Sequence, residues 1–210
     1  MALNTIPALV AHWAAECPDR VWLKDLSDEG ATEWTWAQAE REISAVASVL
    51  EQQFGHGENM VILSRNRAHW FLADIAIIAS GNVTVSMFTT LPESTADYIL
   101  GFTEAKVMFV GETSNWEAVR KVLPADITLV TLPGVELEEA HLTWEDLLAE
   151  GRGQRPQYEA QPDDVISLVF TSGTTGVPKG VIQTHASNLI PINRFINEFG
   201  IRENPRYFSY

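Results

Sequence analysis

The sequence predicts an α/β protein in which a mostly parallel sheet is flanked by helices. Short apolar runs typical of buried strands alternate with helical segments between residues 59 and 131. This alternation favours parallel pairing, because each helix crosses the sheet and returns the next strand in the same direction. Hydrophobic residues make up 46% of the chain and charged residues 20%, so there are enough apolar side chains to bury a core.

The first quarter of the chain predicts a helix, two strands and a longer helix, at residues 6–16, 21–26, 32–34 and 35–54. Thr35 is the expected N-cap of the longer helix, because its hydroxyl can accept a hydrogen bond from an unpaired backbone N–H. Gly55 and Gly57 are expected to end this helix. Its apolar residues share one face, and Glu40 and Glu51 fall on the other.

The alternating region predicts four strands and three helices, namely strands 59–63, 83–87, 106–110 and 127–131 and helices 66–79, 93–102 and 114–123. Asn66 is the predicted cap of the first of these helices. A short helix is expected at residues 144–149. A connecting loop follows at 151–163, where Gly, Pro, Gln and charged residues show no apolar period. Beyond the loop we expect two strands and a helix, at residues 165–170, 180–184 and 185–199.

Charge and hydrophobic pattern exclude several classes of protein. The formal net charge is −14, so the basic surface of a nucleic-acid-binding protein is absent. No Lys or Arg precedes Arg20, which argues against a secretory signal. The longest apolar stretch, residues 71–79, contains Asp74 and is much shorter than the ~20 residues of a membrane span. We therefore expect no nucleic acid partner, no integral membrane segment and a cytoplasmic location, with the single cysteine, Cys17, in a packing role.

The densest chemistry in the chain lies in one glycine-rich segment between the last two predicted strands. It reads Thr171-Ser172-Gly173-Thr174-Thr175-Gly176-Val177-Pro178-Lys179-Gly180-Val181. Its glycines can adopt backbone angles that are closed to other residues, and consecutive N–H groups in such a turn form an anion-binding concavity. The Ser and Thr side chains add hydroxyl donors, and Lys179 adds a point charge suited to phosphate. The segment is therefore predicted to bind phosphate.

The order of residues separates this segment from the Walker-type loop, in which Ser or Thr follows Gly-Lys, because here Gly180 follows Lys179. The segment resembles, almost residue for residue, the phosphate loop of the adenylate-forming (AMP-binding) superfamily. That superfamily includes acyl-CoA synthetases, luciferases and the adenylation domains of peptide synthetases. Thr184-His185 and Asn188-Leu189 resemble the continuation of the motif, and weaker resemblance covers most of the chain from about residue 20. Residues 80–90 and 207–210 are most similar to long-chain fatty-acid–CoA ligases.

The resemblance implies the N-terminal portion of the large domain of such an enzyme, truncated ahead of the C-terminal domain. It implies one AMP-binding fragment over residues 1–210, with an α/β sub-structure at 1–150, a connecting loop at 151–163 and the phosphate-loop strands and following helix at 164–210. The implied reaction is ATP-dependent, AMP-forming activation of a carboxylic acid, in the first place a fatty acid, as an acyl-adenylate that is transferred to CoA. The implied contacts with the ATP phosphates are Thr171, Ser172, Gly173, Thr174, Thr175, Gly176 and Lys179.

ATP, Mg²⁺ and CoA are the cofactors that the resemblance implies. Within these 210 residues it implies no catalytic residue and no metal ligand, so the chain by itself is expected to be inactive. The full-length protein is expected to be cytoplasmic, with peripheral membrane attachment as an open alternative. An adenylation domain for an amino or aryl acid and a short non-catalytic nucleotide-binding module also stay open, because both can carry the same loop.

Three further kinds of residue were weighed as site candidates. His185 follows the loop closely in sequence, but a position at a helix start or on the surface is favoured. Asp163 and Asp164 resemble a metal-binding pair, but they lie in a loop before a strand, so a solvated role is favoured. The numerous tryptophans are expected in the core.

Overall fold

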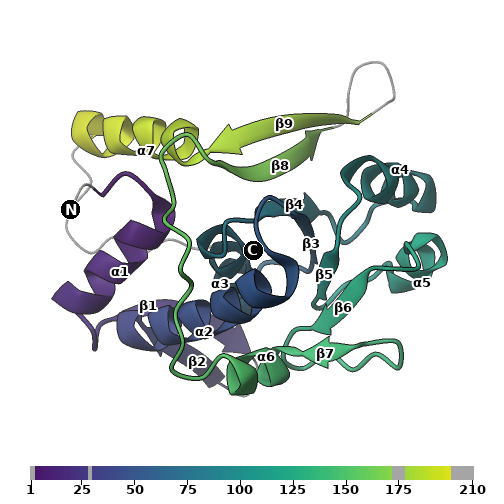
Figure 1. The fold of residues 1–210 in the computed structure, drawn as a ribbon, viewed down its shortest axis with the longest axis horizontal. Helices are drawn as coiled ribbons and strands as arrows, with labels where there is room; N and C mark the ends of the chain where they lie inside the picture. The colour runs from purple at the N-terminus through teal and green to yellow at the C-terminus, as the bar shows by residue number, and fades with distance from the viewer. Residues whose placement is uncertain (1–2, 28–29, 172–177, 200–210) are drawn as a thin grey trace.

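A seven-stranded sheet forms the centre of the protein, with the strand order β7-β6-β5-β3-β4-β8-β9 (Figure 1). The computed structural model describes residues 3–27, 30–171 and 178–199. Neighbouring strands of the sheet pair in parallel, except β8 and β9, which form an antiparallel hairpin at one edge. A separate antiparallel pair, β1–β2, precedes it along the chain. The predicted fold class, α/β with a mostly parallel sheet, is confirmed.

Most elements begin and end close to the positions that the hydrophobic pattern predicts. The strands are β1 (Val21–Ser27), β2 (Gly30–Thr35), β3 (Asn59–Leu63), β4 (Val83–Met87), β5 (Val107–Val110), β6 (Thr128–Thr131), β7 (Leu142–Thr143), β8 (Val165–Thr171) and β9 (Lys179–Thr184). The helices are α1 (Ile6–Glu16), α2 (Trp36–Phe54), α3 (Ala68–Ala79), α4 (Glu93–Thr103), α5 (Trp116–Val119), α6 (Trp144–Glu150) and α7 (His185–Phe199). Strand β7 was not predicted, because two residues are too few to show a period.

Helix α5 is much shorter than the predicted range 114–123. Ser114 Oγ donates to the backbone oxygen of Thr89, and this bond ties the expected first turn to the loop after β4. The C-terminal end of α5 continues as a 3₁₀ turn, Arg120–Val122. Leu123 is extended there because it precedes Pro124, which disfavours the helical conformation of the residue before it.

Helices cover both faces of the large sheet. One core cluster packs α1, α2, α3 and α6 against one set of strand side chains, among them the fully buried Met60 and Ile62. A second cluster packs α4 and α5 against the alternate set, among them Val61 and Leu63. Because neighbouring residues of β3 enter opposite clusters, this strand is apolar on both faces, as expected for a parallel sheet with two covered faces.

The N-termini of α2 and α3 are capped in different ways. Thr35 Oγ1 accepts a bond from the backbone N–H of Gln38, as predicted, and the Gln38 side chain accepts one from Thr35 N. The prediction of Asn66 as the cap of α3 is wrong. The N–H of Ala68 donates instead to Asp25 Oδ1 of β1, over 2.7 Å. An acceptor from an earlier strand therefore caps this helix.

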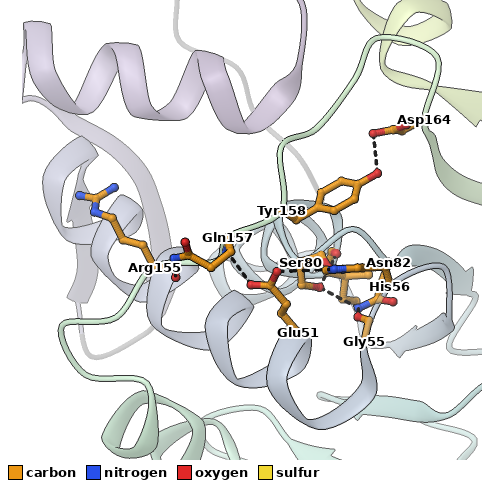
Figure 2. Close-up of polar contacts among 10 residues, drawn as sticks. Glu51, Gly55, His56, Ser80, Asn82, Arg155, Gln157, Tyr158 and Asp164 are labelled. Carbon is orange, nitrogen blue, oxygen red and sulfur yellow. Dashed lines mark hydrogen bonds and ion pairs between the residues drawn. The ribbon is translucent and has the colours of Figure 1, made fainter.

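Residues 151–164, here called the strap, link α6 to β8 and run along α2 (Figure 2). The Arg155 guanidinium pairs with the Glu40 carboxylate, and the backbone N–H of Gln157 donates to Glu51 Oε2 over 2.7 Å. Glu40 lies on the polar face of α2, as predicted, but it is 8% exposed because the strap covers it. The predicted loop is irregular, as expected, but it is fastened to the helix.

The far end of the strap is fixed by Tyr158, as Figure 2 shows. Its hydroxyl donates to Asp164 Oδ2 over 2.7 Å, and its ring lies 4.9 Å from the ring of His56, centroid to centroid. The ring also lies against Gly81, where an added Cβ would come within 2.7 Å of a ring carbon. Gly81 has a φ of +77°, a second reason why glycine suits this position.

The first core cluster encloses a carboxylate that joins two tryptophans. Trp34 Nε1 donates to Glu42 Oε1 and Trp144 Nε1 donates to Glu42 Oε2, each over 3.1 Å. Burial raises the pKa of Glu42, and the two indole hydrogen bonds oppose that rise. His69 stands edge-on to both indoles, and burial lowers its pKa to about 4. The core role expected for the tryptophans is confirmed for Trp34, whereas Trp13 is 38% exposed; Trp144, which was not among the predicted core tryptophans, is also buried.

Helix α3 is apolar along most of its length and carries one acid in its middle, Asp74. Burial raises the pKa of Asp74 to about 6, and the nearby Thr84 side chain opposes part of this rise. Within the described ranges, no helix combines the length and the apolar character that a membrane crossing requires.

Candidate functional site

The β8–β9 hairpin forms one edge of the large sheet and carries the predicted phosphate loop at its tip (Figure 1). β8 pairs in parallel with β4, as far as the pair Ser86–Val169. β9 pairs with β8 from Val165–Thr184 at the base to Thr171–Lys179 at the tip. The tip lies at the carboxyl ends of β4 and β8, and ligands of open α/β sheets bind outside the carboxyl ends of the strands.

The pair Thr171–Lys179 brings together the two ends of the predicted loop. Both residues are exposed, so a ligand can reach the hydroxyl of Thr171 and the ammonium of Lys179. Ser172, Gly173, Thr174, Thr175 and Gly176, the other predicted phosphate contacts, lie outside the described residues. The structure therefore describes two of the seven candidate residues, Thr171 and Lys179, and they are strand partners at the tip of the hairpin.

Gly180 occupies an ordinary strand position opposite Phe170. It is not among the described glycines with positive φ, so the special backbone angles predicted for the glycines of this segment do not apply to it. An added Cβ would meet the Phe170 ring at 3.5 Å, which is a normal contact. The Phe170 side chain is buried in the second core cluster and lies edge-on to Phe102 at 6.0 Å. This packing fixes β8 just before the loop begins.

A hydrogen-bond network ties the base of the hairpin to α7. Ser167 Oγ donates to Gln183 Oε1 over 3.0 Å, and Asn188 Nδ2 donates to the backbone oxygen of Thr184 over 3.2 Å. Helix α7 follows β9 without an intervening residue. The sequence patterns missed this network, because hydrogen bonds between different elements leave no hydrophobic periodicity in the sequence. The only signal was the resemblance at Asn188.

His185 follows β9 at the end opposite Lys179, the described residue that ends the predicted loop. It begins α7, as one of the two favoured alternatives predicted, but the surface position is wrong because the residue is 1% exposed. Its Nδ1 accepts a hydrogen bond from the backbone N–H of Ile6 over 3.1 Å. Burial lowers the pKa of His185, and the charge of Asp164 opposes this effect.

The described residues do not supply a metal site of their own. Among them, no group of three or more His, Cys, Asp or Glu side chains is placed to hold a metal ion. Asp164 is engaged within the strap, because its Oδ2 accepts from the Tyr158 hydroxyl and from the N–H of Gln161.

A protein-family comparison and the curated proteins agree on the relatives of this chain. The family described as AMP-binding enzyme matches residues 10–210. A long-chain-fatty-acid–CoA ligase of Mycobacterium tuberculosis is 32% identical over 204 residues, which cover 89% of this chain and 32% of the relative. The peroxisomal long chain acyl-CoA synthetase 6 of Arabidopsis thaliana is 31% identical over 166 residues, 73% of this chain and 23% of the relative. The chain thus spans about a third of the length, or less, of the curated relatives it matches.

Solved structures match the fold at lower sequence identity. A fatty acyl-adenylate ligase of L. pneumophila, solved with acyl adenylate and pyrophosphate, superposes with a TM-score of 0.76 at 18% identity. The match covers 96% of this chain and 34% of that one. VinN, solved with L-aspartate, gives a TM-score of 0.74 at 18% identity and covers 94% of this chain and 48% of that one.

Proposed function

This chain belongs to the AMP-binding enzyme family, and we propose that it is the phosphate-binding, N-terminal part of an ATP-dependent, AMP-forming acid–thiol ligase. The observation that carries the proposal is the pair Thr171–Lys179, which closes a glycine-rich segment at the carboxyl edge of the sheet. The proposed ATP-phosphate contacts are Thr171, Ser172, Gly173, Thr174, Thr175, Gly176 and Lys179.

The proposed role of these residues follows from the charge that develops in the reaction. A carboxylate oxygen of the acid attacks the α-phosphorus of ATP, the bond to the bridging oxygen breaks, and pyrophosphate leaves with the electron pair. Backbone N–H groups, hydroxyls and the Lys179 ammonium would stabilise the charge on pyrophosphate and orient ATP for in-line attack. Bound Mg²⁺ would add positive charge at the same phosphates. The thiolate of CoA would then attack the acyl carbon and release AMP.

A fatty acid is the proposed acid and CoA the proposed acceptor. The support comes from the curated relatives, which are long-chain-fatty-acid–CoA ligases and acyl-CoA synthetases by name. The second candidate is an adenylation domain for an amino acid, because VinN has the same fold and was solved with L-aspartate. Both candidates share the first chemical step and differ in the acid they accept.

The test is acid-dependent exchange of pyrophosphate into ATP by the full-length protein that contains this chain. Acetate, medium- and long-chain fatty acids, aryl acids and amino acids are compared. Exchange with fatty acids supports the ligase proposal, and exchange with amino acids alone supports the second candidate. A folded protein that binds ATP but exchanges with no acid contradicts both.

Variants of Lys179 link that exchange to the hairpin tip. Lys179→Ala is expected to lower kcat/KM for ATP by about 10²-fold, the typical effect of removing one charge-stabilising donor. Lys106→Ala is the matched control, because Lys106 is a half-exposed lysine that pairs with Asp126 just before β5. Equal activity in both variants would show that Lys179 does not contact the phosphates.

The proposal also covers domain organisation, cellular location and peripheral membrane attachment. The contacts between the strap and α2 support one folded unit over 1–150, 151–163 and 164–210, rather than two domains with a flexible linker. Limited proteolysis would contradict this if cleavage concentrated within the strap. A cytoplasmic location with peripheral membrane attachment is tested by cell fractionation in high salt.

A further inference from the structure

The first residue of α7 caps the first residue of α1. Ile6 N lies 3.1 Å from His185 Nδ1, although the two residues are separated by almost the whole described chain. A backbone N–H can only donate, so Nδ1 accepts and the ring proton lies on Nε2. The imidazole in this contact is therefore neutral. The His185 side chain is buried, which strengthens the bond relative to one in water.

Helix α1 has no cap of its own that replaces this bond. The first four N–H groups of any helix lack partners within the helix. Thr5 occupies the N-cap position of α1 but makes no side-chain cap hydrogen bond, and Pro7 has no N–H. Ile6 therefore obtains its partner from His185, which comes from the other end of the fold.

The same contact fixes the base of the phosphate hairpin. His185 follows Thr184, the last residue of β9, so a shift of His185 moves β9 directly. β9 is an edge strand, and six residues at ~3.3 Å each place Lys179 roughly 20 Å from this base. A tilt of about 5° at the base would move the tip by about 2 Å, and displacements of about 1 Å can cost about 10²-fold in rate.

Among the described residues, this hydrogen bond joins α1 directly to the residue that follows β9. A cavity of about 160 Å³ lies beside it, lined in part by Ile6, Asp74, Gln183 and Asn188. Continuous apolar packing between α1 and the hairpin base is therefore interrupted there. The N–H of Ala186 donates to the oxygen of Pro162 over 2.8 Å, but that bond holds the strap, not α1.

We propose that His185 is a positioning residue for the phosphate site, which holds the β8–β9 hairpin in place by capping α1. The role rests on the proposed function, because it acts through β9 on Lys179. His185 touches neither ATP nor the acid in this arrangement. Its loss should therefore raise the KM for ATP more than it lowers kcat.

The test removes the hydrogen bond from each side. His185→Leu removes the acceptor, and His185→Asn keeps an acceptor near the position of Nδ1. Ile6→Pro removes the donor at a helix position where proline is well tolerated, and Ile6→Ala keeps the donor while removing the side chain. The readouts are hydrogen exchange at the amide of residue 6, where an N–H exists, and the KM and kcat for ATP in pyrophosphate exchange by the full-length protein.

His185→Leu should lower protection of the Ile6 amide about tenfold, the equivalent of one buried hydrogen bond. It should raise the KM for ATP at least about fivefold, because the loop is displaced. His185→Asn and Ile6→Ala should stay near wild type, and Ile6→Pro should raise the KM to the same extent as His185→Leu. The double variant Ile6→Pro/His185→Leu should be no worse than either single variant.

Two results would overturn the inference. Unchanged protection of the Ile6 amide in His185→Leu would show that the bond does not hold α1. A KM for ATP raised equally in Ile6→Pro and Ile6→Ala would show that the Ile6 side chain, not its N–H donor, holds the hairpin. If His185→Leu does not fold, the two Ile6 variants decide the question. Failure of the proposed function gives a different pattern, because wild type itself would then show no acid-dependent exchange while the amide readout still applies.

Discussion

Asp25 Oδ1 lies 2.7 Å from the backbone nitrogen of Ala68, so a strand of the small sheet supplies the cap of α3. The first N–H groups of a helix cost free energy when they are buried without a partner. Asp25→Ala should therefore lower the free energy of unfolding by about 1–2 kcal/mol, whereas Asp25→Asn, which keeps an acceptor, should lower it by less than half of that. Urea unfolding of both variants measures the difference, and equal losses would mean that the negative charge, not the hydrogen bond, stabilises α3.

Asp74 should make stability depend on pH in the opposite sense to a salt-bridged acid. Its pKa is about 6 in the folded protein, against 3.8 for the unfolded group, so folding favours the protonated form. The stabilisation is complete below pH 3.8 and is lost as the pH rises to about 6. Asp74→Asn should therefore raise the free energy of unfolding, relative to wild type, by up to about 3 kcal/mol above pH 6, and by progressively less towards pH 4.

The measurement is urea unfolding of wild type and Asp74→Asn between pH 4 and pH 7.5. Asp126→Asn is the matched control, because Asp126 is exposed and pairs with Lys106 at the surface. A difference between wild type and Asp74→Asn that does not vary over this range would disprove the raised pKa.

Gly81→Ala should destabilise the protein by displacing Tyr158. The added methyl would lie 2.7 Å from the Tyr158 ring, and the φ of +77° is unfavourable for alanine. A loss of about 1–3 kcal/mol in the free energy of unfolding is expected, together with faster proteolysis of the strap. In a Tyr158→Ala background the steric part disappears, so Gly81→Ala should cost clearly less there. An equal cost in both backgrounds would mean that backbone strain alone is responsible.

Glu42→Gln should break one of the two indole hydrogen bonds. The Glu42 carboxylate accepts from Trp34 and from Trp144, whereas a glutamine offers one acceptor and turns a donor towards the second indole. A buried unpaired donor costs about 1–3 kcal/mol. Unfolding free energy and tryptophan fluorescence should both change, and Trp34→Phe in addition should recover part of the loss. No change in either quantity at neutral pH would contradict the role of the Glu42 carboxylate as the acceptor for both indoles.

Periodic patterns predicted this fold well where packing decides the structure. Helix α2 and strand β3 follow from apolar spacing alone, because both faces of β3 are buried and the apolar positions of α2 enter the core. The patterns failed where a partner lies far away in the sequence. Nothing near Ala68 identifies Asp25 as its cap, and nothing near Glu40 identifies Arg155.

The candidate site was predicted from the chemistry of its residues rather than from hydrophobic periodicity. Glycines, hydroxyls and a lysine between two strands predicted a phosphate loop, and the structure pairs Thr171 with Lys179 at its two ends. The residues that support the hairpin from below, such as Ser167, Gln183 and His185, carry no such chemical signature. Their role depends on which segments meet at the base, and that is a property of the three-dimensional fold.

The parallel pairing of β8 with β4 also constrains the order in which the protein can assemble. Ser86 and Val169 are register partners, so β8 has no docking edge until β4 has formed beside β3. Pairings between residues so distant in sequence carry a large loop-closure cost and tend to form late in folding. During synthesis the β8–β9 hairpin would therefore emerge after the other strands of the sheet and meet a preassembled edge, so that the proposed phosphate site would be completed late in folding.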